Sequence, residues 1–537
     1  MTTRGGLNRN QTPSPSPKGP GRSPLGFLGG WQPLDRAVAL VALVATVAIA
    51  VVLLLGDRTA AGVRDFSWAD QTISARDRAF ILSFNRPVER NSVESTLKIE
   101  PPLPGKISWS GPRMAYTLDE PVPYGSSYGV TVAGMRAAKP DGEVDPDARP
   151  APPFVASFRS RDRAFAYIGT AAEEAGRLVL YNLSRQERQI LTPPDLVVNE
   201  FIPSPNRDRI LFAAIDRRNS GDGASAIPDQ KLFTVTTGLG DGPENRRWFQ
   251  RQPVEAGEIT LVLDNQDYQN LKFDLSPDGD TVVVQRVSRS DPGEFGLWVL
   301  RSGRKPEPLE SAPGGEFQIT PDGAAIAMTQ GEGVAILPLP ERGSRRLGAA
   351  TDRVIEPIDF LPKFGSLLDF TADGTKAAMV QFNPDFTRAL YAITNQGEQI
   401  ELGRLSGSIL AAQFSPDGDT LFGLLTQLID GETYREQPYL AAIDLKTKAV
   451  SPLLILPEQP DVTLDLAPDG LALLFDRVVT VQGDGATEGA GPVTRGGAPV
   501  QESQLWLLPI VRNGAGKVQA IEPQELPLQG LRPQWMP

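Results

Sequence analysis

A turn that recurs five times between apolar segments most constrains the fold of this chain. Each copy places Asp-Gly, usually after Pro, between two apolar runs, as in FDLSPDGDTVVVQRV (273–287) and AAQFSPDGDTLFGLL (411–425). Pro presets φ for the first turn position, Asp can accept a hydrogen bond from its own backbone, and Gly accepts a positive φ. Each copy therefore predicts a β-hairpin. The turn residues are Pro277, Asp278, Gly279, Pro321, Asp322, Gly323, Asp373, Gly374, Pro416, Asp417, Gly418, Pro468, Asp469 and Gly470.

The spacing of these turns predicts a β-propeller. The five turn aspartates are 44, 51, 44 and 52 residues apart, and a propeller blade takes about 40–50 residues. A third apolar run follows most copies and a fourth usually comes soon after it, which gives the four strands of a blade. A degenerate sixth copy begins at Phe201. The sequence therefore predicts six internal blades.

The two ends of this region complement each other. The final residues GLRPQWMP (530–537) have the pattern of a strand that precedes a Pro-Asp-Gly turn, but the chain stops there. Residues 163–194 have the pattern of the second, third and fourth strands of a blade that lacks its first. We therefore expect a composite seventh blade, which would close the ring and remove its open edges.

With its FSPDG-like repeats, the region from about residue 163 to 537 resembles the WD-related propellers of the TolB type. The resemblance covers about 70% of the chain. It implies a propeller fold much more strongly than it implies a function, because such propellers include binding platforms, Tol-system components and noncatalytic domains of peptidases.

A second all-β domain is expected before the propeller. Short alternating runs between residues 70 and 160 are separated by turn clusters, which is typical of a β-sandwich. The segments FNRPV (84–88), YGSSYGVTV (124–132) and FVASFRS (154–160) resemble bacterial Ig-like domains of S-layer proteins. That resemblance implies a spacer or adhesive role.

An apolar segment at 37–55 predicts one transmembrane helix. Its nineteen residues carry no charge, and they are preceded by five bases and one acid, so the positive-inside rule places the N-terminus in the cytoplasm. The expected location is the bacterial plasma (inner) membrane, with the bulk in the periplasm or outside the cell. An alternative is a cleaved signal peptide.

Together these features predict an all-β protein, an Ig-like β-sandwich followed by a roughly seven-bladed β-propeller, with one N-terminal transmembrane helix. The expected organisation is a disordered cytoplasmic tail at 1–36, the helix at 37–55, a linker at 56–69, the sandwich at 70–160 and the propeller at 161–537.

Composition excludes several kinds of chemistry. The chain has no cysteine and no histidine, so it cannot build thiolate, Ser-His-Asp or histidine-ligated zinc sites. Its net charge of -12 opposes nucleic-acid binding. The turn aspartates are explained by turn formation, with metal binding or acid catalysis as the alternative reading. We therefore expect no enzyme activity, cofactor or metal.

Two long insertions are candidates for recognition, because loops on a rigid scaffold often carry binding residues. One, about 217–252, contains the aromatic and basic run Arg246, Arg247, Trp248 and Phe249, which we take as a candidate partner contact. The other, 481–503, is rich in glycine. The alternative for both is a tolerated surface loop.

Three functions stay open at this stage. The first is a membrane-anchored, noncatalytic binding scaffold whose propeller face engages an envelope protein or polymer. The second is a structural or adhesive envelope protein that acts through the Ig-like domain. The third is a carboxylate-based glycosidase or lyase, which would require two acids about 5–10 Å apart in one cleft.

Overall fold

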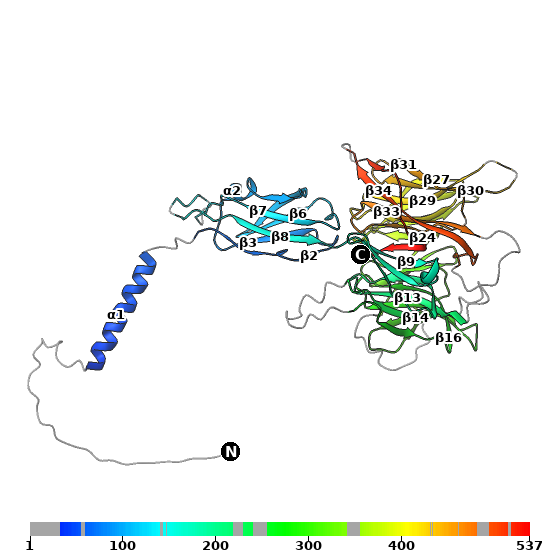
Figure 1. Cartoon of the computed structure of the whole chain (residues 1–537), viewed down its shortest axis with the longest axis horizontal. Coiled ribbons are helices and arrows are strands. Elements are labelled where there is room, and N and C mark those ends of the chain that lie inside the picture. The colour runs from blue at the N-terminus through cyan, green and yellow to red at the C-terminus, as the bar shows by residue number, and fades with distance from the viewer. Residues whose placement is uncertain are drawn as a thin grey trace, which may run out of the picture. The chain divides into compact units, whose positions relative to one another are not determined.

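The computed structural model describes the chain except residues 1–32, 55–59, 140–142, 147, 219–228, 240–254, 341–354, 430, 432, 460, 481–492 and 514–516. Within the described ranges the fold is almost entirely β, with two α-helices, α1 and α2, and one 3-10 turn, η1, as predicted (Figure 1). The described residues of 61–145 and 150–537 form one compact unit, and α1 lies outside it.

The helix expected at 37–55 is present as α1 (Pro33–Leu54). Its large apolar side chains between Val38 and Val51 are exposed. The segment 37–55 was expected to cross the membrane. Among the described residues, however, no helix is both long and apolar enough to cross a bilayer.

The first β-domain consists of two four-stranded sheets. Rings from one sheet contact rings from the other: the centroids of Phe66 and Phe158 are 6.4 Å apart, and Trp68 lies 5.0 Å from Phe158. The sheets therefore pack face to face as a sandwich. The first sheet has the strand order β1 (Val63–Phe66), β3 (Ala79–Phe84), β6 (Arg113–Leu118), β5 (Gly105–Ser110). The second has the order β2 (Thr72–Ile73), β8 (Phe154–Ser160), β7 (Ser127–Val132), β4 (Lys98–Glu100). Helix α2 (Arg90–Glu94) lies between β3 and β4 in the sequence.

The expected boundary of this domain was wrong at its start. Strand β1 begins at Val63, inside the segment 56–69 that was predicted to be a linker. Its sequence VRDF has only two apolar residues, which is too few to reveal alternation. Burial of Phe66 and Trp68 makes this segment part of the sandwich core.

Among the residues that the structure describes, seven sheets follow, and each contains at least four antiparallel strands. The first sheet contains β9 (Ala164–Gly169), β10 (Leu178–Asn182), β11 (Glu187–Ile190) and β37 (Gly530–Trp535), and the 3-10 turn η1 (Ala172–Glu174) follows β9. The second contains β12 (Leu196–Pro203), β13 (Arg209–Asp216), β14 (Lys231–Thr236) and β15 (Ile259–Leu263), and the third contains β16 (Tyr268–Leu275), β17 (Thr281–Ser288), β18 (Phe295–Arg301) and β19 (Glu307–Leu309). The fourth contains β20 (Phe317–Ile319), β21 (Ala325–Gln330), β22 (Gly333–Pro338) and β23 (Asp359–Pro362), the fifth β24 (Phe364–Phe370), β25 (Lys376–Phe382), β26 (Arg388–Thr394) and β27 (Gln399–Leu405), and the sixth β28 (Ile409–Phe414), β29 (Thr420–Leu428), β30 (Glu436–Asp444) and β31 (Val450–Ile455). The last is β32 (Leu464–Leu466), β33 (Ala472–Thr480), β34 (Val500–Arg512), β35 (Val518–Ala520), with β36 (Gln524–Glu525) beside β34.

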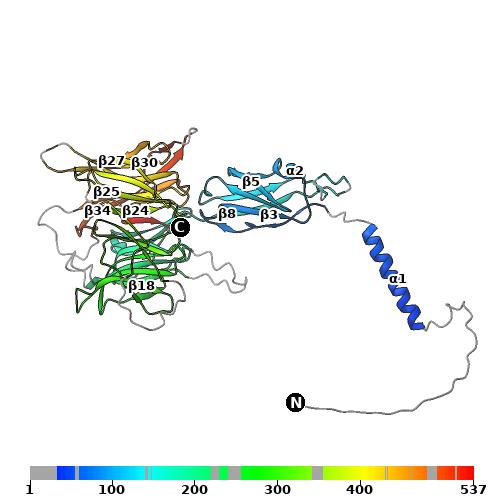
Figure 2. The same ribbon diagram turned by 180° about the vertical axis from the view of Figure 1, so that it is seen from behind.

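The hydrophobic cores lie between neighbouring sheets. One cluster joins Ala378 and Leu390 of the β24–β27 sheet to Phe414 and Ile443 of the next sheet. The first strands of successive sheets also contact one another, as β24 does β28 and β28 does β32. Neighbouring sheets therefore stack against one another as in a propeller (Figure 2).

The predicted pairing of the chain ends is confirmed. Strand β37 pairs antiparallel with β9, and Gly530 lies opposite Gly169 (Figure 1, red beside β9). The rings of Trp535 and Phe165 lie 5.7 Å apart across this pair. The last strand of the chain thus completes the first sheet.

Both predicted insertions are shorter than expected. Strand β14 (Lys231–Thr236) lies inside the segment 217–252, and β34 begins at Val500, inside 481–503. Strand β14 was missed because polar, glycine-containing sequence flanks it. Strand β34 contains the apolar run at 503–510 and only begins earlier, at the polar residues 500–502.

Candidate functional site

The five turn aspartates have the geometry that the turn prediction requires. Each accepts a hydrogen bond from the backbone N–H two residues later, at 3.0–3.1 Å. The glycine that follows each has φ between 67° and 78°. Within the described parts of the chain, no group of three acidic residues is placed to hold a metal ion.

The turns also contact one another around the ring. A Cβ built on Gly470 would lie 3.0 Å from Cδ of Pro416, which belongs to the preceding turn, and one on Gly374 would lie 3.8 Å from Pro321. In these two pairs the glycine of one turn packs against the proline of the turn before it, whereas a Cβ on Gly418 would meet Thr371 and one on Gly323 would meet no atom within 4 Å.

Asp469 differs from the other turn aspartates. Its second carboxylate oxygen accepts hydrogen bonds from the backbone N–H of Tyr124 at 2.9 Å and from the Arg163 guanidinium at 3.1 Å. Its side chain is only 1% exposed. This turn therefore binds the sandwich as well as closing its own hairpin.

A second repeated position, four residues before each turn aspartate, joins the sheets. Its side chain is Asp or Gln in every complete copy, and it hydrogen-bonds to the first strand of the next sheet. The five bonds are Asp274 to Ile319 N, 2.7 Å; Gln318 to Leu368 O, 3.1 Å; Asp369 to Phe414 N, 2.7 Å; Gln413 to Leu466 N, 2.7 Å; and Asp465 to Trp535 N, 2.6 Å. We call these five residues the inner polar ring.

The three acids of the inner polar ring are unusually weak acids. Burial raises the pKa of Asp274 to about 6 and the pKa of Asp369 and of Asp465 to about 7, although backbone N–H donors oppose the shift. These carboxyls hold the sheets together and titrate close to neutral pH.

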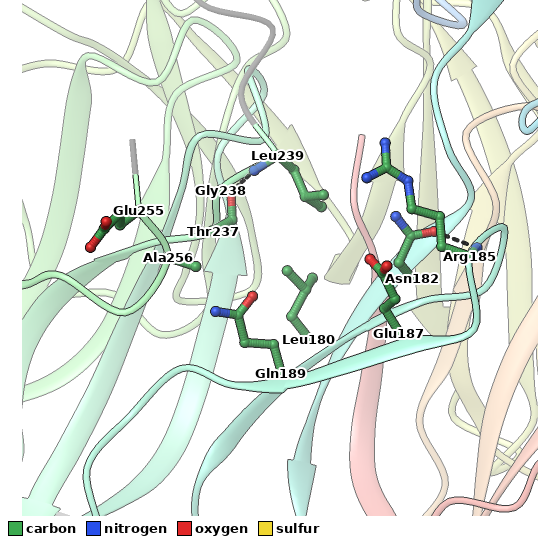
Figure 3. A pocket seen from close by; sticks show the side chains of 10 residues that line it. All are labelled: Leu180, Asn182, Arg185, Glu187, Gln189, Thr237, Gly238, Leu239, Glu255 and Ala256. Atoms are coloured by element: carbon green, nitrogen blue, oxygen red, sulfur yellow. Dashed lines mark hydrogen bonds between the residues drawn. The ribbon is translucent and has the colours of Figure 1, made fainter. Parts of the chain in front are cut away.

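A polar depression of about 410 Å³ lies between the first two sheets of the propeller. Arg185 and Glu187 approach it from one side and Glu255 from the other (Figure 3). Within the lining, the side-chain oxygen of Asn182 accepts a hydrogen bond from the backbone N–H of Arg185 at 3.1 Å. This bond holds the turn that carries Arg185. The lining residues are Leu180, Asn182, Arg185, Glu187, Gln189, Thr237, Gly238, Leu239, Glu255 and Ala256.

The predicted contact residues Arg246, Arg247, Trp248 and Phe249 lie outside the described residues. The described ends of the same predicted insertion, at Leu239 and Glu255, both border the depression.

Sequence reasoning missed the inner polar ring, although a signal existed. Asp or Gln recurs at the same offset before all five turns, and a buried polar group needs a partner. The depression had no such signal, because its residues come from strands and turns of two different blades.

Comparisons with known proteins find only distant likeness. No family model matches the chain, and no curated protein matches it. Among solved structures, TolB from Acinetobacter baumannii is 10% identical over 81% of this chain and 82% of that one, with a TM-score of 0.36. A functionally unknown protein from Desulfotomaculum acetoxidans is 11% identical over 67% and 95%, with a TM-score of 0.36. An oligogalacturonate lyase in complex with manganese is 13% identical over 66% and 82%, with a TM-score of 0.30. These likenesses are too distant to show a family or an activity.

Proposed function

We propose that this chain is a membrane-anchored, extracytoplasmic and noncatalytic binding scaffold. In this proposal α1 is the anchor, an Ig-like sandwich is the spacer, and a seven-bladed propeller of the TolB type engages an envelope protein or polymer. The lack of histidine and cysteine supports a noncatalytic role. The exposed apolar side chains of α1 support the anchor.

The polar depression between the first two sheets is the observation that carries the binding role. It offers Arg185, Glu187 and Gln189 from β11 and the turn before it, all of them exposed. Hydrogen-bonding side chains of both charges on a rigid sheet suit a polar partner better than an apolar one.

Photo-crosslinking from the depression tests this proposal. The chain has no cysteine, so Gln189→Cys gives one attachment point for a thiol-reactive photo-crosslinker. We expect illumination of native membranes to yield a discrete adduct of higher mass. The matched control is Ile455→Cys, which is 66% exposed at the outer edge of another sheet. The proposal would be contradicted if both variants gave the same adduct in equal yield, or if Gln189→Cys gave no adduct.

A further inference from the structure

The connection between the sandwich and the propeller is only three residues long. Strand β8 ends at Ser160 and β9 begins at Ala164. The carboxylate of the middle residue, Asp162, accepts a hydrogen bond from Arg159 of β8 at 2.7 Å. The same carboxylate is paired with Arg185, in the hairpin between β10 and β11, at 2.8 Å. One acid therefore ties a residue of the sandwich to a residue of the propeller.

The residues on either side of Asp162 are also held in place. The Arg161 N–H donates to the Ile73 oxygen of the sandwich at 3.0 Å, and the Arg163 N–H donates to the Ser184 hydroxyl of the propeller at 2.8 Å. A flexible linker, in contrast, leaves its backbone groups to water. The short, hydrogen-bonded connection therefore gives the two domains little freedom.

Two loops of the sandwich contact the Asp-Gly turns of the propeller. In one loop, the Tyr124 N–H donates to Asp469, in the turn of the seventh propeller sheet, at 2.9 Å. In the other, the Arg76 guanidinium donates to the Pro277 oxygen, in the turn of the third sheet, at 3.3 Å. The Tyr124 hydroxyl joins the two loops, since it accepts the Ala75 N–H at 3.0 Å. The sandwich therefore links turns of two sheets that are not consecutive in the chain.

The buried carboxylate of Asp469 is the strongest of these contacts. Its side chain is 1% exposed. One oxygen accepts the Leu471 N–H within the turn at 3.1 Å, and the other accepts the Tyr124 N–H and the Arg163 guanidinium. Hydrogen bonds to a charged group are stronger than those between neutral groups. One oxygen of this turn is thus used entirely by the sandwich and the connection.

The sandwich end of the connection also holds the last residue of the chain. The Arg161 guanidinium donates to the Pro537 oxygen at 2.9 Å. The preceding residue, Met536, is buried, and its N–H donates to the Ala164 oxygen of β9 at 2.9 Å. These two bonds lie directly after β37, the strand that completes the first propeller sheet.

We propose that the sandwich is an internal clamp of the propeller, which holds β37 against β9. Its contacts with Asp469, Pro277 and Pro537 fix the propeller at three separate points, one of them directly after the closing strand. The clamp keeps β37 over the edge of β9, which could otherwise pair with another chain. This role goes beyond that of a spacer, and it does not depend on a partner at the polar depression.

An engineered disulfide tests whether the sandwich is held on the propeller. The chain has no cysteine, so Gly125→Cys with Ser184→Cys gives one pair across the two domains. A Cβ on Gly125 would lie 3.8 Å from the Ser184 Cβ, close to the mean of about 3.8 Å in disulfides. We expect mild oxidation of the full-length chain in detergent to link the pair, which peptide mass mapping detects.

The matched control combines Ser184→Cys with Gly111→Cys. Gly111 also lies in the sandwich and has a positive φ, +56°, but a Cβ there would meet no atom within 4 Å. We expect no link in this pair. Failure of the Gly125 and Ser184 pair to link, or equal linking in both pairs, would overturn the proposal.

Hydrogen exchange in β37 tests the clamp itself. Asp469→Asn keeps one oxygen for the Leu471 N–H but places an NH2 group where the sandwich needs an acceptor. We expect amide exchange in β37 to become at least about tenfold faster. The matched control is Asp322→Asn, whose carboxylate accepts hydrogen bonds from its own turn and which should leave exchange in β37 unchanged. Wild-type exchange in Asp469→Asn would overturn the clamp.

The disulfide pair decides the question if Asp469→Asn does not fold. In the double variant of Gly125 and Ser184, the oxidised form cannot release the sandwich, whereas the reduced form can. We expect slower exchange in β37 in the oxidised form. Equal exchange in the two forms would show that the sandwich does not hold the closing strand.

Discussion

At the scale of single residues, the turn aspartates are chemically alike but differ in what they stabilise. The Asp322 carboxylate accepts hydrogen bonds from its own turn, from the Thr320 hydroxyl at 2.6 Å and the Ala324 backbone N–H at 3.0 Å. Asp469 adds the Tyr124 N–H and the Arg163 guanidinium. The same repeated residue therefore has a local role in one blade and a wider role in another.

Alanine substitution should separate these two roles. We expect Asp322→Ala to lower the free energy of unfolding by about 1 kcal/mol, since it removes turn hydrogen bonds at an accessible site. Asp469→Ala should cost about 2–3 kcal/mol, because it also leaves Arg163 and a backbone N–H without their acceptor. Denaturant unfolding measures both values, and equal losses would contradict the wider role of Asp469.

The inner polar ring makes stability depend on pH. Its acids have a pKa of 3.8 before perturbation and about 6–7 in the folded chain. Because folding favours their protonated forms, the stability that they contribute is complete below about pH 4 and is lost as the pH rises through 6–7. Turn acids such as Asp322 and Asp373, whose pKa is lowered by hydrogen bonds, lose their contribution only below about pH 4.

We therefore expect Tm to fall between pH 5 and pH 8, and Asp369→Asn to reduce that fall. The amide cannot ionise, but its oxygen can still accept the Phe414 N–H. Asp373→Asn, four residues later in the turn, is the matched control and should leave the fall in Tm between pH 5 and pH 8 unchanged, because Asp373 titrates below that range. An Asp369→Asn protein with the wild-type pH profile would show that this carboxyl does not titrate as argued.

At the scale of elements, β37 closes the ring by packing as well as by pairing. Leu531, Trp535 and Met536 are buried and belong to two different hydrophobic clusters. Without this strand, β9 would be an open edge that can pair with other chains. Closure therefore depends on eight residues at the end of the sequence.

Gly530→Ala should weaken this closure. A Cβ at that position would lie 2.3 Å from Cδ2 of Tyr167 and 3.0 Å from the Ile168 oxygen, so we expect a loss of about 1–3 kcal/mol. The control is Gly403→Ala in β27, where a Cβ would meet no atom within 4 Å. Denaturant unfolding reports the difference, and equal stability of the two variants would contradict a tight joint at β37.

Much of this element-scale architecture could be predicted, because its signals are local and repeated. The Asp-Gly turns revealed hairpins, and GLRPQWMP revealed the closing strand, since each matches a repeat of known meaning. The links between sheets were missed, because Asp369 and Phe414 are brought together only by the stacking of two blades. Short strands such as β1 and β14 carry too few apolar residues to stand out from loops.

At the scale of the whole molecule, the described residues form an apolar helix, a β-sandwich and seven further sheets, the first of which is completed by β37. The outermost strand of a sheet, such as β11 or β15, keeps a free edge, whereas β37 covers the edge of β9. The depression near Gln189, which we propose as a binding surface, is lined by residues from strands and turns of the first two sheets.

Cysteine labelling tests most directly whether this scaffold is anchored with its propeller outside the cytoplasm. The cysteine-free chain allows single replacements, Gln189→Cys in the depression and Ser14→Cys in the N-terminal tail. In intact spheroplasts, we expect a membrane-impermeant maleimide to label the membrane-bound Gln189→Cys protein, and to label Ser14→Cys only after lysis. Labelling of Ser14→Cys but not Gln189→Cys before lysis, or recovery of the chain without membranes, would contradict the account.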